Sequence, residues 1–257
     1  MTMTNAVVAA LYRHPVKGFT PEPLTEARLP TGGWFPGDRM YAVEDGPSGF
    51  DPEAPEQLSK TRFTVLMREA TLARVRTRWD EASDLLTVEA DDRPTLTVHL
   101  SDPEDRSRFE VWLTEFLGAA AEGPLRLIPA GDSHRFMDSR SGRVSILNLA
   151  SVRDLETRLG RHVDPRRFRA NLLIEGLQPW VENGWSGRRI AVGGVRLVGA
   201  KPIVRCAATH VDPDTGERDL DVCAALFDHY GQVLCGLYAS IEAGGRIAVG
   251  DALEILP

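Results

Sequence analysis

The sequence predicts a mainly β protein of the α+β class, built as two packed β-barrel-rich domains with a few helices. Its 257 residues contain many short apolar segments bounded by turn residues, which is typical of strands in barrels and sandwiches. These segments do not alternate regularly with helical ones, as a doubly wound parallel sheet would require. The length suits two domains of ordinary size, and we place them at residues 1–120 and 121–257.

Short apolar runs predict five strands in the first domain, at residues 7–12, 40–43, 70–75, 85–88 and 96–100. Residues 46–57 are rich in Pro, Gly and acidic side chains and predict an exposed loop. A helix begins near Ser101 or Asp102, with Pro103 in its first turn, and ends at Gly118. This helix closes the first domain.

The second domain begins with a strand at residues 125–128 and a helix at residues 151–159, capped by Ser151 and ended by Gly160. A second helix is expected at residues 220–230, where apolar side chains recur at helical spacing. Gly193 and Gly194 predict a tight hairpin. The remaining strands are expected at residues 172–175, 190–192, 195–198, 233–239, 247–249 and 252–256.

Composition narrows the range of partners. There are 37 acidic and 30 basic residues, a net charge of −7, so no general electrostatic attraction to nucleic acid or to anionic membranes is expected. The five N-terminal residues lack the basic and apolar parts of a signal peptide, and no apolar run approaches membrane-spanning length. The three cysteines form no CxxC pair. We therefore expect a cytoplasmic protein.

Cys206 is the cysteine best placed for chemistry. It follows a strand, and Pro202 argues against an uninterrupted central strand through this segment, so Cys206 is expected in a loop. The adjacent Arg205 favours the thiolate, the form that attacks electrophiles and binds soft metals. On this feature alone, a buried structural cysteine and a reactive one are equally compatible with the sequence. Cys223 and Cys235 lie on apolar faces and are assigned to the core.

Three clusters place cations in otherwise turn-like sequence: residues 14–18 with Lys17, residues 37–39 with Arg39, and residues 166–171. In an extended chain Arg169 and Asn171 point the same way and offer a guanidinium and an amide to one ligand. Taken singly, each cluster is more often a solvated surface than a site. The six histidines form no metal-binding pattern, and no Gly-x-Ser-x-Gly elbow is present.

The order of these segments resembles the MOSC proteins, named for the C-terminal domain of molybdenum cofactor sulfurase. His14-Pro15-Val16-Lys17-Gly18 and Gly37-Asp38-Arg39 resemble Tyr-Pro-Val-Lys-Ser and Gly-Asp-Arg of the family's N-terminal β-barrel. The resemblance covers nearly the whole chain. In the C-terminal part it rests on Phe168-Arg169-Ala170-Asn171, Glu182 with Trp185, Arg205-Cys206, Val211-Asp212-Pro213-Asp214-Thr215-Gly216 and Val249-Gly250-Asp251.

The layout is similar to that of the amidoxime-reducing branch of this superfamily. The resemblance implies a molybdenum cofactor (molybdopterin), used without pyridoxal phosphate to reduce N-hydroxylated or related N-oxygenated small molecules. It implies that the thiolate of Cys206 is both the catalytic residue and the molybdenum ligand. The residues implied to hold the pterin and its phosphate are Lys17, Arg39, Asn148, Arg169, Asn171 and Arg205.

Two features depart from the family pattern. Gly18 stands where a serine is common, which removes one hydroxyl contact to the cofactor, and Val204 stands where reductases often carry a polar residue. Some bacterial relatives carry a ferredoxin domain, whereas this sequence ends at Pro257 without one. A separate electron-donor protein is therefore expected.

Two other hypotheses fit the same residues. In the first, Cys206 is a persulfide carrier that delivers sulfur to a cofactor or biosynthetic acceptor. In the second, the protein is a non-catalytic module that binds a pterin or another phosphorylated ligand through its basic residues. Replacement of Cys206 by serine separates the three: the enzyme loses metal and turnover, the carrier loses transferable sulfur, and the binding module keeps most of its affinity.

Overall fold

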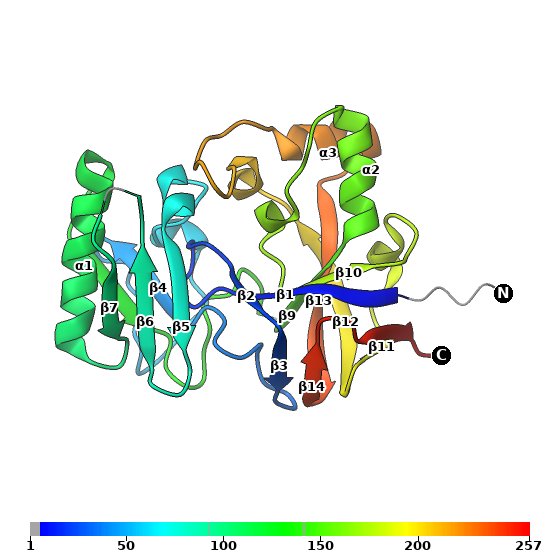
Figure 1. Ribbon diagram of the computed structural model, residues 1–257, viewed down its shortest axis with the longest axis horizontal. Helices are drawn as coiled ribbons and strands as arrows, with labels where there is room; N and C mark the ends of the chain where they lie inside the picture. Colours follow the sequence, from blue (N-terminus) through cyan, green and yellow to red (C-terminus); the bar gives the residue numbers. More distant parts are fainter. Residues whose placement is uncertain (1–5, 92, 141) are drawn as a thin grey trace.

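The structure, a computed structural model, describes residues 6–91, 93–140 and 142–257 (Figure 1). Two units lie side by side: one contains strands β4 to β8 and helix α1, and the other is a β-barrel that carries helices α2 and α3 at one end. Residues 1–5, on which the expectation of no signal segment rested, lie outside the described residues. Within the described part, no helix combines the length and apolarity needed to span a bilayer.

The barrel consists of seven strands, and its closure comes from β1 (Ala6–Arg13), which pairs with both β10 and β15. The β9–β10 pair is parallel and the others are antiparallel. Closure leaves no open edge in the order of the strands, and the short β2 (Glu22–Leu24) pairs with β1 at Leu11–Arg13, beyond the contact of β1 with β15. This confirms the mainly β fold class. The other barrel strands, in order around the ring, are β10 (Leu172–Glu175), β9 (Val144–Asn148), β13 (Leu234–Ala243), β12 (Val195–Val204), β11 (Arg189–Val192) and β15 (Ala252–Ile255).

The other unit holds two small sheets. Strands β5 (Arg76–Asp80), β6 (Leu85–Glu89) and β7 (Leu96–His99) form one, and β4 (Tyr41–Asp45) pairs with β8 (Leu125–Pro129). Helix α1 (Pro103–Leu117) covers them and buries Phe109, Trp112, Leu113 and Leu117 in their shared core. As predicted, it has proline in its first turn and ends at Gly118; its N-cap is Asp102, whose carboxylate accepts from two backbone N–H groups.

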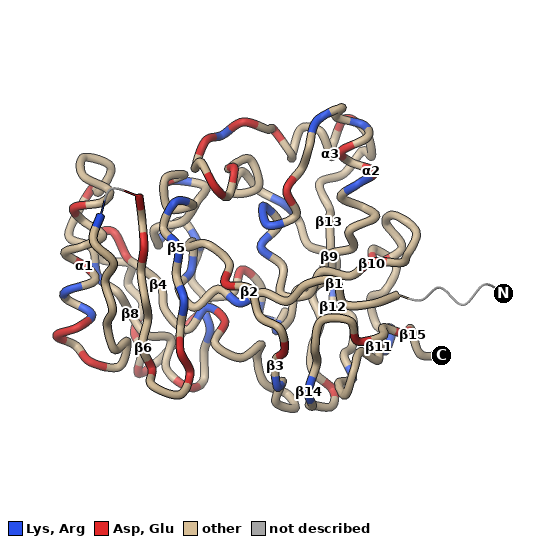
Figure 2. Tube along the Cα trace, viewed as in Figure 1, with Lys and Arg blue, Asp and Glu red and all other residues tan. Residues whose placement is uncertain are grey.

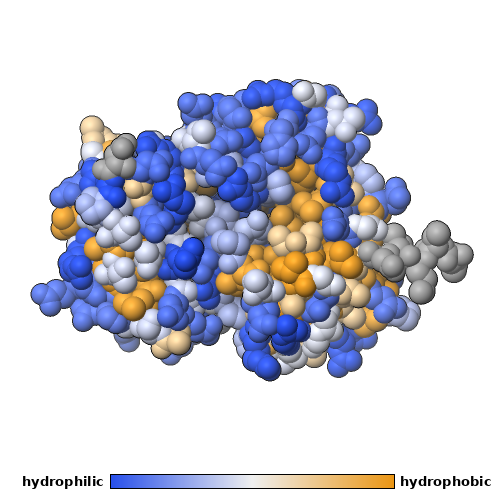
Figure 3. Space-filling model, in the orientation of Figure 1, coloured by the Kyte–Doolittle hydropathy of each residue, from blue (hydrophilic) through white to orange (hydrophobic). Residues whose placement is uncertain are grey.

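The chain crosses between the units early. Strand β1 belongs to the barrel, and β3 (Glu26–Leu29) pairs with β14 (Gly245–Ala248) near the C-terminus. The division of the sequence at residue 120 stays a prediction. Space-filling atoms show mostly hydrophilic side chains on this face, with apolar side chains gathered over the barrel (Figure 3).

The strand expected at residues 70–75 is wrong, because Ala70–Arg74 forms a 3-10 helix. The side chain of Glu69 accepts a hydrogen bond from the N–H of Thr71 and caps this turn. Strand β5 follows it and was not predicted, since three of its five residues are charged. They point outwards, while Thr77 and Trp79 point inwards.

The predicted cap of α2 is also wrong. Helix α2 (Leu149–Leu159) begins after Asn148, whose side-chain oxygen accepts from the N–H of Ala150, while Ser151 bonds to Glu182 instead. The third helix, α3 (Val222–Tyr230), is confirmed and ends at the left-handed Gly231. Strand β9 was not predicted, although all five of its residues are buried.

Strand β12 corrects the expectation about Pro202, because it continues through the proline to Val204. The pairing with β13 shifts register between Gly199 and Lys201 and again between Pro202 and Val204. Such bulges allow a central strand to accommodate a residue that has no N–H to donate. The second shift lies opposite Gly236, whose φ is +80°.

Candidate functional site

A cavity of about 340 Å³ is lined by residues from both units. Its wall combines residues between 17 and 67 with residues between 138 and 238, so distant parts of the sequence meet there. Basic residues lie on both sides of this junction (Figure 2). We call it the Cys206 cavity.

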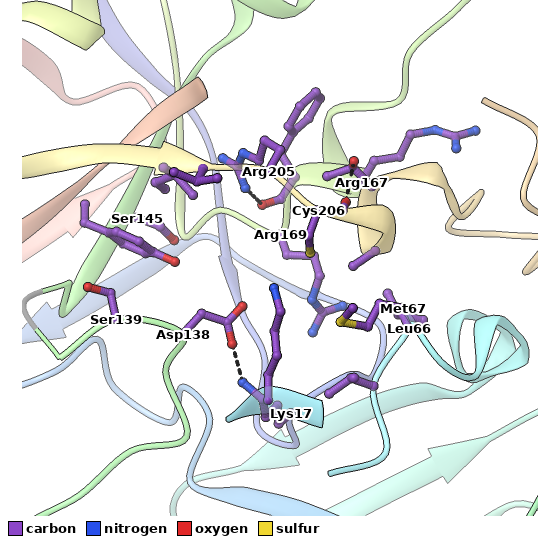
Figure 4. Close-up of a pocket in the computed structure, with 18 of the residues that line it drawn as sticks. Lys17, Leu66, Met67, Asp138, Ser139, Ser145, Arg167, Arg169, Arg205 and Cys206 are labelled. Atoms are coloured by element: carbon purple, nitrogen blue, oxygen red, sulfur yellow. Dashed lines mark hydrogen bonds and ion pairs between the residues drawn. The ribbon is translucent and has the colours of Figure 1, made fainter. Parts of the chain in front are cut away.

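Cys206 lies where β12 gives way to a 3-10 helix (Ala207–His210), for which it is the N-cap residue. The turn is held by Thr209, whose N–H and hydroxyl both donate to the carbonyl of Cys206, at 2.9 Å each. Cys206 is half-buried, and its sulfur points into the cavity towards Arg169 (Figure 4). The prediction that Cys206 lies in a loop next to cations is therefore confirmed.

Arg169 and Arg205 are each anchored on one side only. Arg205 donates from Nε to the carbonyl of Cys235 and from Nη1 to that of Phe168, both at 2.7 Å. Arg169 donates from Nη1 to the carbonyl of Phe19 at 2.6 Å. The Nη2 atoms of both arginines are buried and have no hydrogen-bond partner among the described residues. Because buried donors are nearly always satisfied, these two groups indicate a missing acceptor.

The electrostatics of Arg169 and Arg205 also indicate a missing anion. Burial lowers the pKa of Arg169, and the charge of Arg39 lowers it further; burial also lowers the pKa of Arg205. An arginine nevertheless stays protonated, so both charges are held in an environment that lacks sufficient negative charge. An anionic ligand in this cavity would relieve that cost.

The backbone at two of these arginines is strained. Arg39 and Arg169 have φ values of +51° and +52°. This left-handed conformation is energetically unfavourable for any residue that has a Cβ atom. Arg39 Nη2 donates to the carbonyl of Arg169 at 3.1 Å, so the two turns support each other. Strain of this kind tends to occur at functional sites, where it positions a side chain.

Lys17 and Asp138 face Cys206 from the opposite wall (Figure 4). Lys17 Nζ donates to Asp138 at 2.5 Å and to the carbonyl of Phe136 at 2.8 Å. Burial lowers the pKa of Lys17, and Asp138 partly offsets this; burial raises the pKa of Asp138, but Lys17 and other nearby cations bring it below its ordinary value. Asp138 is therefore ionised, and the basic residues that line the cavity outnumber it.

Of the residues predicted to form the site, the structure brings five together: Lys17, Arg39, Arg169, Arg205 and Cys206 all line the cavity. Asn148 and Asn171 are fully buried and are not among the described residues that line it. Their proposed roles in holding a cofactor gain no support from this placement.

The two asparagines have structural partners. Asn148 caps α2 and donates to the carbonyl of Gln178 and the carboxylate of Glu182. Asn171 accepts from the N–H and hydroxyl of Ser145, at 3.0 and 2.8 Å. The idea that Arg169 and Asn171 point the same way assumed an extended chain, and the left-handed turn at Arg169 removes that condition.

Sequence reasoning missed Lys60, Asp138 and Tyr238, which also line the cavity. Lys60 begins a short 3-10 helix (Lys60–Arg62), Asp138 lies outside the helices and strands, and neither belongs to a motif. Tyr238 had a usable signal, because it alternates with the buried Leu237 and Ala239 along β13. Burial lowers the pKa of Lys60, but a side-chain interaction with Cys206 and the charge of Asp138 together raise it above its ordinary value.

Gly18, which stands where a serine is common, has a backbone and surroundings that disfavour a side chain. Its φ is +92°, and a Cβ at this position would lie 2.9 Å from the carbonyl oxygen of Thr64. A serine here would be strained and would press on the backbone of Thr64 and Val65.

A loop formed by residues 211–221 ties three walls of the cavity together. Arg218 donates to the carbonyls of Leu66 at 2.8 Å and Met67 at 3.0 Å, and to that of Ala207 at 3.3 Å. Arg167 points away from the cavity (Figure 4) and pairs with Asp212 and Asp219 at 3.0 and 2.7 Å. The loop thereby fixes the turn after Cys206 against the other unit.

Fold and site together define a β-barrel protein with a thiol exposed to a cavity lined by cations. The MOSC N-terminal beta barrel domain matches residues 5–124, and the MOSC domain matches residues 133–254. Because these two matches together cover nearly the whole chain, it belongs to the MOSC family.

Curated relatives match part of the chain. It is 35% identical over 123 residues to mitochondrial amidoxime-reducing component 1 of Mus musculus, a match that covers 43% of this chain and 36% of that protein. It is 29% identical over 120 residues to a molybdenum cofactor sulfurase of Caenorhabditis briggsae, covering 42% of this chain and 16% of that protein. Both matches thus span well under half the length of these relatives.

Among solved structures, the YUAD protein from Bacillus subtilis aligns with 98% of this chain and 95% of its own, with a TM-score of 0.47 and 13% sequence identity.

Proposed function

We propose that this protein binds a molybdenum cofactor and reduces N-hydroxylated or related N-oxygenated compounds, with Cys206 as the molybdenum ligand. The observation that carries the proposal is the arrangement around Cys206: its sulfur faces a cavity in which Arg169 and Arg205 each keep a buried N–H group without a partner among the described residues. A relative named amidoxime-reducing component supports the reaction class.

The residues present fit such a group. A thiolate is a soft ligand suited to molybdenum, and a pterin phosphate is an anion that accepts several hydrogen bonds at once. Arg169 and Arg205 would hold the anionic part through their free Nη2 groups, with Arg39 and Lys17 adding charge. The arginines are fixed by backbone carbonyls, so little conformational entropy is lost when the ligand binds.

When bound, the cofactor supplies a two-electron centre for cleaving an N–O bond, a reaction that consumes two protons and releases water. Cys206 holds its sulfur towards the cavity because Thr209 fixes the turn behind it. Lys60 and Tyr238 line the same cavity and are the side chains placed to donate hydrogen bonds to an oxygen of the substrate.

The test is reduction of an aromatic amidoxime by protein purified from a host that makes the cofactor, with a chemically reduced viologen as electron donor. Turnover in the wild type and its loss in Cys206→Ser support the proposal. Cys223→Ser is a matched control, because that thiol does not line the cavity in the described part of the chain. Metal-loaded protein without turnover of any N-hydroxylated compound would contradict the proposal.

A separate electron-donor protein and a cytoplasmic location are part of the same proposal.

A persulfide carrier is the second candidate, favoured by the half-buried Cys206 and by the relative named molybdenum cofactor sulfurase. A carrier needs access for a sulfur donor but no buried anion-binding groups, so the cation-lined cavity favours the first candidate over it. Transfer of labelled sulfur from Cys206 to an acceptor, in protein free of molybdenum, would reverse this order.

A further inference from the structure

A second cavity, of about 380 Å³, lies beside the Cys206 cavity. It is formed by Trp34, by residues 55–57 and by parts of segment 133–140, and we call it the Trp34 pocket. Ser139 lines both cavities, and a smaller cavity shares Lys17 with the first and Gln57 and His134 with the second. A ligand in the Trp34 pocket would therefore lie next to the site of chemistry.

One wall comes from the end of the acidic, proline-rich loop at residues 46–57. Gln57 donates from Nε2 to the carbonyl of Met137 at 2.6 Å, which fixes the end of the loop against the opposite wall. Pro55, Met137 and Trp34 give the pocket apolar surface. The rest of the lining is polar or charged, so the pocket suits a small ligand that combines a charged group with a limited apolar face.

Arg135 is held as a fixed cation in this pocket. Its Nη1 donates to the carbonyls of Gly131 and His134 at 2.8 and 2.5 Å, and its guanidinium carbon lies 5.2 Å from the centroid of the Trp34 ring. Its Nε is buried and has no hydrogen-bond partner among the described residues. A guanidinium that is held in place, and that keeps one N–H group without a partner among the described residues, is the arrangement expected for an anion site.

The charges of the Trp34 pocket favour an anion. Arg140 adds a second, exposed guanidinium, and neither Arg135 nor Arg140 forms an ion pair within the described ranges. Glu56 contributes one negative charge to the lining. Two guanidinium groups and one carboxylate in the lining leave a net positive charge, and Arg143, whose guanidinium carbon lies 4.6 Å from the centroid of the Trp34 ring, adds to it. A guanidinium can bind a carboxylate through two parallel hydrogen bonds, so a carboxylate suits this pocket.

We propose that the Trp34 pocket binds the carboxylate of the substrate while its N-oxygenated end reaches the Cys206 cavity. The preferred substrates are then N-hydroxylated compounds that carry a carboxylate on an aromatic or aliphatic body. This inference rests on the proposed function, since it names the substrate class of the same site.

The kinetic test compares benzamidoxime with its 4-carboxylate. The wild type has the higher kcat/KM for the carboxylate. In Arg140→Gln the ratio of the two kcat/KM values falls about tenfold, the effect of losing one charge-assisted hydrogen bond. Arg153→Gln is the matched control: it makes the same charge change at an exposed position of α2 and keeps the wild-type ratio. A wild type that prefers the neutral compound, or equal ratios in the two variants, overturns the inference.

A binding measurement separates this inference from the proposed function. Calorimetric titration with benzoate is expected to show binding by the wild type and about tenfold weaker binding by Arg140→Gln. Arg135→Lys keeps the charge but removes the Nε–H donor, and it also weakens binding. Benzoate binding with no reduction of any amidoxime leaves the pocket standing and removes the proposed function. Absence of benzoate binding at millimolar concentration removes the pocket, even where amidoximes are reduced.

Discussion

Gly236 lies against the guanidinium of Arg205, and Gly236→Ala is expected to damage both fold and site. Its φ is +80°, and an added Cβ would lie 2.6 Å from the carbonyl oxygen of Ile146 and 3.0 Å from Nη2 of Arg205. The left-handed backbone costs an alanine about 1–2 kcal/mol, and the overlap in a packed barrel adds about 1–3 kcal/mol. We therefore expect a total loss of about 2–5 kcal/mol.

The assay is urea unfolding followed by circular dichroism, with Gly231→Ala as a matched control. Gly231 is also left-handed, with a φ of +67°, but a Cβ there would meet nothing within 4 Å. It therefore loses only the backbone contribution, about 1–2 kcal/mol. Equal losses in the two variants would show that the contacts with Ile146 and Arg205 carry no energy, which would refute the reasoning about how this arginine is seated.

Other parts of the structure give three further predictions. Arg218→Ala should lose about 1–2 kcal/mol in urea unfolding, because its hydrogen bonds to the carbonyls of Leu66, Met67 and Ala207 are lost; an unchanged midpoint would exclude it as a tie between the units. Burial, with the charges of Arg39 and Arg169, lowers the pKa of His14 to about 3, so below pH 6.5 the unfolded chain takes up a proton that the folded one does not. Stability should fall by about 2 kcal/mol from pH 7 to pH 5, and His14→Gln should remove most of this fall. Phosphate at 10 mM, if bound with a Kd of about 1 mM, should stabilise the cofactor-free protein by about 1.4 kcal/mol and raise Tm by about 2–4 °C; the same shift in Arg169→Gln would contradict an anion site at that residue.

The sequence predicted those parts of the fold in which local signals and tertiary structure agree. Helix α1 has a cap, a first-turn proline and a terminal glycine, and all three occur where predicted. Strand β5 was not predicted, because the charged residues on its outward face obscure the alternation of buried and exposed positions. The prediction that Pro202 interrupts the strand was wrong, because a bulge in the pairing with β13 accommodates a residue without an N–H group. That bulge depends on the partner strand and on Gly236.

The site was predicted where a motif joins a cation to a turn, as at Lys17, Arg39 and Arg205. It was missed at Lys60 and Asp138, because their segments reach the cavity only through the packing of the two units. The prediction that Arg169 and Asn171 point the same way assumed an extended chain. The left-handed turn at Arg169, which depends on contacts with residues far away in the sequence, removes that assumption.

The molybdenum content of protein purified from a cofactor-producing host, measured beside Cys206→Ser, tests the central claim most directly. Binding by the thiolate of Cys206 in a cavity with two free guanidinium donors predicts metal near one atom per chain in the wild type and its loss in the variant. Wild-type protein without molybdenum, or equal metal in both proteins, would contradict the assignment of Cys206 as the ligand.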